Sequence, residues 1–155
     1  MAHLVAATGA DLGVMISASH NPMPDNGIKL FARGGGKLDD AVEAAIEKRM
    51  GEPWERPTGR AVGRIVDDSD AAARYIDHLL ASVSTPLAGL KIVVDCANGA
   101  SSQVAPLVYE RAGATVVAIH HSPDGWNINE NCGSTHMSDL QAAVVAHKAD
   151  FGIAH

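Results

Sequence analysis

The side chains best suited to chemistry lie in residues 16–22, which read Ile-Ser-Ala-Ser-His-Asn-Pro. An apolar run of strand length at 12–16 leads into this segment, and the proline and the Asn-Gly pair at 26–27 predict turns after it. Ser19 is therefore expected in a polar loop at the end of a strand, where reactive side chains are commonly held. A serine hydroxyl placed in this way is a candidate nucleophile.

Ser19 is followed directly by His20, and this pair raises the alternative of a serine hydrolase. Adjacent residues in an extended segment point to opposite sides, so we expect His20 to be poorly placed to deprotonate Ser19. The chain also lacks the Gly-x-Ser-x-Gly sequence of a nucleophile elbow. A hydrolase and a purely structural turn both stay open as alternatives for this segment.

A second group of reactive side chains follows later in the chain and raises the question of zinc. It consists of His120, His121 and His136, with Cys132. Their spacing fits no common zinc-ligand pattern, so we do not expect zinc. Cys132 and Cys96 are the two cysteines of the chain, and we expect both to be reduced thiols without a chemical role.

Alternating strands and helices must position these residues, which indicates an α/β fold. In the second half, continuous apolar strands alternate with helices as a βαβαβ unit, typical of a parallel sheet covered on both faces. Ligands of such sheets gather at the carboxyl ends of the strands, here the loops 96–101 and 120–137. The pattern predicts strands at 12–16, 28–31, 90–95, 115–119 and 150–154, and helices at about 40–50, 69–83, 102–112 and 138–148.

The two predicted helices before residue 90 have distinct signals. Asp39 or Asp40 can cap the first, with Glu43 placed as in a capping box and apolar residues at 42, 46 and 50 on one face. The second has an amphipathic stripe that we expect in the core. The members of this stripe are Ala72, Tyr75, Ile76, Leu79, Leu80 and Val83. Between the helices, residues 52–63 are rich in Pro, Gly and Arg, and 61–66 reads as a short strand, so a domain boundary is expected near Asp67.

Composition excludes several classes of function. The chain has 155 residues, of which 46% are hydrophobic, a content sufficient for a core. A net charge of −6 and scattered basic residues argue against nucleic-acid binding. No apolar run approaches the roughly 20 residues that span a bilayer, and no signal peptide is visible. We therefore expect a cytoplasmic protein with no nucleic-acid or membrane partner.

The serine loop resembles the phosphoserine loop of the α-D-phosphohexomutase superfamily, which reads Thr/Ser-Ala-Ser-His-Asn-Pro followed by Asn-Gly-(Ile/Phe)-Lys. Further matches at 127–129 (Asn-Ile-Asn), 132–136 (Cys-Gly-Ser-Thr-His) and 149–154 (Ala-Asp-Phe-Gly-Ile-Ala) are similar to the bacterial phosphoglucosamine mutases. The resemblance covers essentially the whole chain. It implies parts of two mixed or parallel α/β sandwich domains of the phosphohexomutase type. Residues 1–66 would be the C-terminal part of domain 1, and 67–155 the N-terminal part of domain 2.

The resemblance implies roles for four residues. Ser19 would carry the phosphoryl group, and Lys29 would assist proton transfer and neutralise phosphate charge, with a solvated strand lysine as the alternative. His20 and Asn21 would contact substrate or, as readily, satisfy backbone groups around the proline. A Mg²⁺ ion would bind the phosphoserine oxygen of Ser19 and carboxylates from an Asp-Gly-Asp-x-Asp-Arg loop, which is expected just beyond residue 155. On the same resemblance we expect no zinc at the histidines named above.

The activity implied is the interconversion of glucosamine 6-phosphate and glucosamine 1-phosphate through a phosphoserine, with a sugar bisphosphate as intermediate and activator. Because the metal loop, the sugar-recognition loop, the C-terminal phosphate loop and the N-terminal motif of the family are absent, we expect an interior fragment that is inactive alone. Two alternatives stay open: a phosphomannomutase/phosphoglucomutase, and a non-catalytic remnant or assembly piece.

Overall fold

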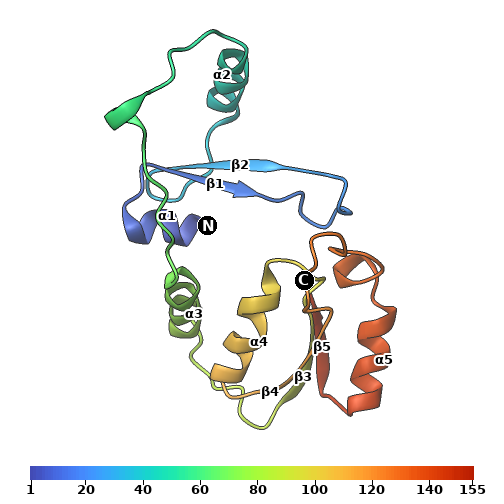
Figure 1. The fold of residues 1–155 in the computed structure, drawn as a ribbon. Coiled ribbons are helices and arrows are strands. Elements are labelled where there is room, and N and C mark those ends of the chain that lie inside the picture. The colour runs from blue at the N-terminus through green and yellow to red at the C-terminus, as the bar shows by residue number, and fades with distance from the viewer. The chain divides into compact units, whose positions relative to one another are not determined.

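The computed structural model describes residues 1–155, and the chain forms two compact units. One unit contains residues 1–16 and 28–71, and the other contains 17–27 and 72–155. The serine loop thus belongs to the second unit although both segments that flank it belong to the first. Figure 1 labels the elements, and each unit is described by itself below. No helix of the chain combines the length and apolar character needed to cross a membrane.

The first unit is built on an antiparallel hairpin. Strand β1 (Leu12–Ile16) pairs with β2 (Ile28–Ala32), with Leu12 opposite Ala32 and Ile16 opposite Ile28. Helix α1 (Ala2–Thr8), which the sequence pattern did not predict, packs against this hairpin through Val5, 3% exposed. The close approach requires glycine at position 13, because a Cβ there would lie 2.3 Å from Val5 Cγ2. The unit also contains helix α2 (Asp40–Met50) and the short 3-10 helix η1 (Gly59–Ala61).

Two local predictions for this unit are wrong. The expected strand at 61–66 is absent, and Ile65 is 98% exposed, because no neighbouring strand pairs with this apolar run. The expected capping box of α2 does not form either. Its N-cap residue makes no side-chain cap hydrogen bond, and Asp40 and Glu43 instead lie 3.1 and 3.7 Å from the Lys37 ammonium. Ion pairs with Lys37 are thus found where the capping box was expected.

The second unit contains a three-stranded parallel sheet in the order β4 (Thr115–Ile119), β3 (Lys91–Asp95), β5 (Phe151–Ala154), together with helices α4 (Ser101–Arg111) and α5 (Ser138–His147). Ile92, Val93 and Val94 of the central strand are completely buried. In Figure 1, α4 and α5 lie on opposite sides of this sheet. The alternation of side chains along β3 explains this arrangement: Ile92 and Val94 pack with Ala105 of α4, while a Cβ at Gly152 of β5 would contact Leu140 of α5. The other elements are α3 (Ala71–Ala81) and the 3-10 helix η2 (Gly133–Thr135).

These observations confirm the predicted α/β class and the parallel βαβαβ unit. The apolar stripe of α3 is only partly in the core. Ile76 is buried, whereas Ala72 and Val83 at its two ends are exposed. The carboxyl ends of the three strands meet at one edge, where Asp95 ends β3 and the chain continues into the loops that the sequence pattern singled out.

Candidate functional site

The loop that carries Ser19 is closed by its own backbone. The Ser17 N–H donates to the Gly27 carbonyl at 2.9 Å, and the Asn21 N–H donates to the Ala18 carbonyl at 3.2 Å. A Cβ at position 27 would lie 2.3 Å from the Ser17 carbonyl oxygen, so only glycine permits this closure. Ser19 itself is exposed and has a left-handed backbone, with φ 60°. The glycine of the Asn-Gly pair at the end of the loop is therefore required for steric reasons.

The hydroxyl of Ser19 faces its neighbour more closely than expected. Ser19 Oγ lies 3.5 Å from His20 Nδ1. The expectation that these side chains point to opposite sides is wrong, because it assumed an extended segment and the left-handed φ of Ser19 turns the chain. A separation of 3.5 Å is nevertheless at the limit of hydrogen bonding, and both residues are exposed. The hydroxyl is therefore open to an incoming phosphoryl donor or acceptor.

Asn21 and Asn129 brace the loop. The Asn21 side-chain amide donates to Asp25 Oδ2 at 3.0 Å. The Asn129 side-chain amide donates to the Asn21 carbonyl at 2.8 Å and lies 3.4 Å from the Ser19 carbonyl. Sequence reasoning placed residue 129 in a motif without giving it a role. The residue type was the available signal for this role. Asparagine tolerates a left-handed backbone, and its side-chain amide can donate two hydrogen bonds.

Lys29 lies in β2, opposite Met15, and its side chain is exposed. It belongs to the first unit, whereas Ser19 belongs to the second. An approach of the Lys29 ammonium to the phosphoryl group of Ser19 therefore stays a prediction. The alternative of a solvated strand lysine stays open beside it.

Asp95 organises the carboxyl end of the parallel sheet. Its carboxylate is completely buried, and both oxygens accept backbone hydrogen bonds, Oδ1 from Ala97 N–H at 2.9 Å and Oδ2 from Gly133 N–H at 3.0 Å. His120 Nδ1 lies 3.1 Å from the same Oδ2. Asp95 thus connects the loop after β3 to residues far along the chain.

The loops around this carboxylate adopt conformations that most residues avoid. The non-glycine residues with positive φ here are Ala97, Asn98, His120, Asn129 and Asn131. Each left-handed residue costs about 1 kcal/mol, somewhat less for asparagine. Two short backbone hydrogen bonds offset this cost: Asn98 N–H to the His120 carbonyl at 2.6 Å and Asn129 N–H to the Ala97 carbonyl at 2.9 Å. Such concentration of strain is typical of functional sites.

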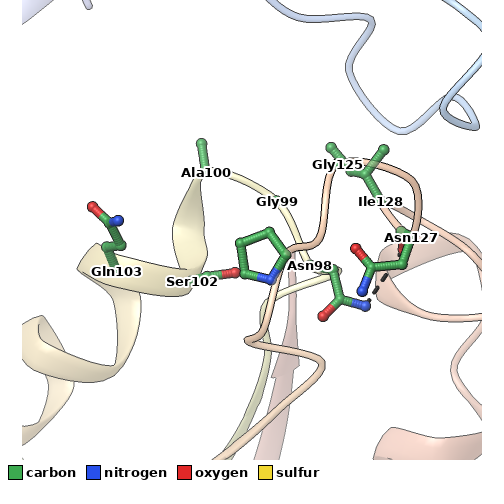
Figure 2. A pocket seen from close by; sticks show the side chains of 9 residues that line it. Asn98, Gly99, Ala100, Ser102, Gln103, Gly125, Asn127 and Ile128 are labelled. Atoms are coloured by element: carbon green, nitrogen blue, oxygen red, sulfur yellow. Dashed lines mark hydrogen bonds between the residues drawn. The ribbon is translucent and has the colours of Figure 1, made fainter.

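A cavity of about 530 Å³ lies beside these loops, at the start of α4. Its lining comes from two segments, labelled in Figure 2: Asn98, Gly99, Ala100, Ser102 and Gln103 from the first, and Gly125, Asn127 and Ile128 from the second. The Asn98 amide bridges the two segments through the Asn127 carbonyl at 3.4 Å. None of the side chains that line it is ionisable. The cavity can therefore contribute hydrogen bonds to a ligand but no general acid or base.

One group of side chains could hold a metal ion. The ligand atoms of Asp95, His120 and Cys132 all lie within 4.8 Å of one another. Burial, followed by the nearby carboxylates, raises the pKa of the Cys132 thiol. The sequence grouped His120 with His121 and His136, but both of these are exposed and the third member is Asp95. Both cysteines are free, as expected, and both are buried.

Comparison with protein families gives two matches that together cover most of the chain. Residues 1–56 match the family model described as phosphoglucomutase/phosphomannomutase, alpha/beta/alpha domain I, and residues 73–155 match that of domain II. A solved structure titled as a phosphoglucomutase/phosphomannomutase family protein, from Burkholderia thailandensis, is similar, with a TM-score of 0.70 and 25% identity. The alignment covers 93% of this chain and 31% of that one.

Curated relatives are similar over the full length of the chain. The phosphoglucosamine mutases of Saccharopolyspora erythraea and Mycolicibacterium paratuberculosis are 63% and 58% identical to it over 155 residues. That of Thermobifida fusca is 59% identical. The chain spans about a third of these relatives, 35% in the first two.

Proposed function

The chain belongs to the phosphoglucomutase/phosphomannomutase family, and on that premise we propose that it forms the phosphoserine-bearing part of a phosphoglucosamine mutase. The observation that carries the proposal is the Ser19 hydroxyl, exposed in a loop that Gly27 and Asn129 fix. The substrate class is a hexosamine phosphate, in line with the names of the relatives that are 57–63% identical. Within this proposal, residues 1–66 belong to domain 1 and residues 67–155 to domain 2.

The reaction consists of two phosphoryl transfers at one oxygen. Phosphorylated Ser19 donates its group to the C1 hydroxyl of glucosamine 6-phosphate: the bond from phosphorus to Ser19 Oγ breaks, a bond to the sugar oxygen forms, and the hydroxyl proton passes to the serine oxygen. The bisphosphate then turns, and its 6-phosphoryl group returns to Ser19 Oγ. Glucosamine 1-phosphate leaves and the phosphoserine is restored, so no co-reactant is consumed. A sugar bisphosphate supplies the first phosphoryl group as activator.

In this proposal three side chains assist the reaction at the Ser19 oxygen. Lys29 neutralises charge on the phosphoryl group and relays the hydroxyl proton. His20, whose Nδ1 lies 3.5 Å from Ser19 Oγ, donates a hydrogen bond to a phosphoryl oxygen once the serine is modified. Asn21 holds the loop shape through Asp25 and Asn129. The transfer depends on positioning more than on covalent chemistry, which suits a rigid loop with an exposed hydroxyl.

The residues of this chain do not form a Mg²⁺ site around Ser19. Mg²⁺ takes six ligands, mostly oxygens, whereas phosphorylated Ser19 would offer one phosphoryl oxygen. The cluster of metal-ligating side chains in the structure, Asp95 with His120 and Cys132, contains a thiol and an imidazole, which Mg²⁺ does not favour. We therefore propose that Ser19 is at most one ligand of a Mg²⁺ ion, and we derive no step through that ion.

The test transplants the chain into a longer relative. Residues 1–155 replace the matching segment of the Saccharopolyspora erythraea phosphoglucosamine mutase, which is 63% identical throughout that segment. Incubation with a ³²P-labelled glucosamine bisphosphate, followed by peptide mapping, should place the label on Ser19. Ser19→Ala should remove both label and turnover, whereas Ser17→Ala should retain both, because it removes only one hydrogen bond to the loop.

Two outcomes contradict the proposal: a label on Ser17, or turnover that survives Ser19→Ala. The chimera takes its sugar-recognition loop from the relative, so glucosamine 6-phosphate is the substrate assayed. A correctly folded chimera with no activity on it would favour the non-catalytic alternative.

A further inference from the structure

Asp95, His120 and Cys132 come together from three segments of the second unit. Asp95 ends β3, His120 follows the last residue of β4, and Cys132 precedes η2. Their ligand atoms lie within 4.8 Å of one another, and those of Asp95 and His120 are 3.1 Å apart. The cluster is distinct from the Ser19 loop and plays no part in the phosphoryl transfer proposed above.

The carboxylate of this cluster has His120 as its ion-pair partner and pairs with no Lys or Arg. Asp95 and Cys132 are completely buried, and a buried carboxylate requires compensation. Two backbone N–H groups supply part of it, one to each oxygen of Asp95, and each oxygen keeps a further lone pair. A second carboxylate, that of Asp139, lies 3.3 Å from the other nitrogen of His120. One imidazole thus stands between two carboxylates, with a thiol beside it.

The nitrogen of His120 that faces the cluster has no partner. His120 Nδ1 is buried and makes no hydrogen bond, although Asp95 Oδ2 is 3.1 Å away, so this approach lacks hydrogen-bond geometry. A neutral imidazole has one N–H, and the Asp139 carboxylate 3.3 Å from Nε2 favours the tautomer that carries the proton there. In that tautomer Nδ1 is unprotonated, and it lies within 4.8 Å of both the Asp95 carboxylate and the Cys132 thiol. A carboxylate on the outer nitrogen is the arrangement that orients histidines in zinc sites.

We propose that Asp95 Oδ2, His120 Nδ1 and Cys132 Sγ bind one Zn²⁺ ion, with a solvent molecule as fourth ligand. Zinc accepts oxygen, nitrogen and sulfur together at about 2.0–2.3 Å, which places the ligand atoms of a tetrahedral site about 3.3–3.8 Å apart. Separations between 3.1 and at most 4.8 Å reach this range with small side-chain movements. The thiol makes the site unsuitable for Mg²⁺ or Ca²⁺.

The ion would act as a clamp on the loops. His120 carries a left-handed backbone, φ 46°, and Cys132 adjoins Gly133, whose N–H bonds Asp95. Coordination would link the ends of β3 and β4 to the segment that also contains Asn129. The serine loop is bonded to Asn129, so zinc would stiffen the support of that loop without touching it.

The reduced, metal-free chain is titrated with Zn²⁺ by calorimetry and with Co²⁺ by absorption spectroscopy. We expect one Zn²⁺ per chain and a thiolate-to-cobalt charge-transfer band with tetrahedral d–d bands. Cys132→Ser should abolish the charge-transfer band, and His120→Asn, which tolerates the left-handed backbone, should abolish stoichiometric Zn²⁺ binding. The matched controls are Cys96→Ser, equally buried but outside the cluster, and His121→Asn; both should bind as the parent chain does.

Asp139→Asn provides a graded test, because it keeps the three ligands and removes only the carboxylate behind His120. The affinity for Zn²⁺ should fall about 10- to 100-fold, with the cobalt spectrum retained. Circular dichroism checks that each variant folds. Two results with the parent chain would overturn the proposal even if every variant were unfolded. One is bound Co²⁺ without a thiolate charge-transfer band, and the other is the absence of stoichiometric Zn²⁺ binding by the reduced chain. An equal loss of Zn²⁺ binding in His120→Asn and His121→Asn would overturn the proposal as well.

Discussion

The side-chain amide of Asn129 donates a 2.8 Å hydrogen bond to the backbone carbonyl of Asn21, across 108 residues of sequence. Asn129 also donates its own backbone N–H to the Ala97 carbonyl at 2.9 Å. A single residue therefore connects the carboxyl end of the parallel sheet to the loop that presents Ser19. Its φ of 56° is one that asparagine adopts more readily than most residues. The serine loop owes part of its shape to this connection.

Replacement of Asn129 by aspartate should loosen the serine loop. Aspartate tolerates the left-handed backbone but offers oxygens to carbonyls that need a donor. Loss of a hydrogen bond worth about 0.5–1.5 kcal/mol should speed amide exchange at residues 17–27 about 2- to 12-fold, as measured by hydrogen–deuterium exchange with mass spectrometry. Asn131→Asp is the control, since residue 131 has a similar φ of 53° and the same change of charge. Equal acceleration in both variants would contradict the role of Asn129.

Lys29→Met in the chimera should lower kcat/KM at least about tenfold, because a group that assists proton transfer contributes about 10²-fold or more. Steady-state kinetics with glucosamine 6-phosphate measures the effect. Lys37→Met is the matched control: Lys37 is also an exposed lysine of the first unit, but its ammonium pairs with Asp40 and Glu43. Such surface pairs contribute little, so the control should retain activity. A Lys29 variant within a factor of two of the parent would favour the solvated strand lysine.

Local patterns predicted the parallel sheet because β3 is apolar at every position from Ile92 to Val94 and turn signals bound it. The same reasoning failed at residues 61–66, where an apolar run has no strand to pair with. Whether an apolar segment becomes a strand depends on a pairing strand that is often distant in sequence. Helix α1 escaped prediction because only Val5 of its seven residues is buried.

The candidate site was predictable where a local motif sufficed and not where backbone conformation decides. Ser19 was found from its motif, but its left-handed φ reverses the expected direction of His20. The approach of Asp95 to His120 and Cys132 joins residues 25 to 37 positions apart and depends on strand register, which spacing does not encode. The role of Asn129 is equally long-range.

Asp95→Ala should destabilise the metal-free chain by at least about 2 kcal/mol, because two buried backbone N–H groups lose their acceptors at about 1–3 kcal/mol each. Urea unfolding followed by circular dichroism measures the loss. Asp150→Ala is the comparison, since Asp150 Oδ2 also accepts a backbone hydrogen bond, from Lys91 at 2.8 Å, but at an exposed position where water can replace it. A similar loss in both variants would show that burial of the Asp95 carboxylate is not the cause.

Ionisation of the Tyr109 phenol should lower the stability of the chain at alkaline pH. Burial chiefly, with Cys96 as a second cause, raises the pKa of the Tyr109 phenol above its ordinary value of 10.0. The fold therefore favours the neutral phenol, and this contribution is complete below pH 10, then lost as the pH rises through the folded-state pKa. Tyr75→Phe leaves Tyr109 as the single tyrosine, whose phenolate absorption should appear at a higher pH in the folded chain than in urea. Tyr109→Phe should reduce the alkaline loss of stability without removing it, because burial also raises the pKa values of the Cys96 and Cys132 thiols. Coincident folded and unfolded titrations of Tyr109 would refute this account.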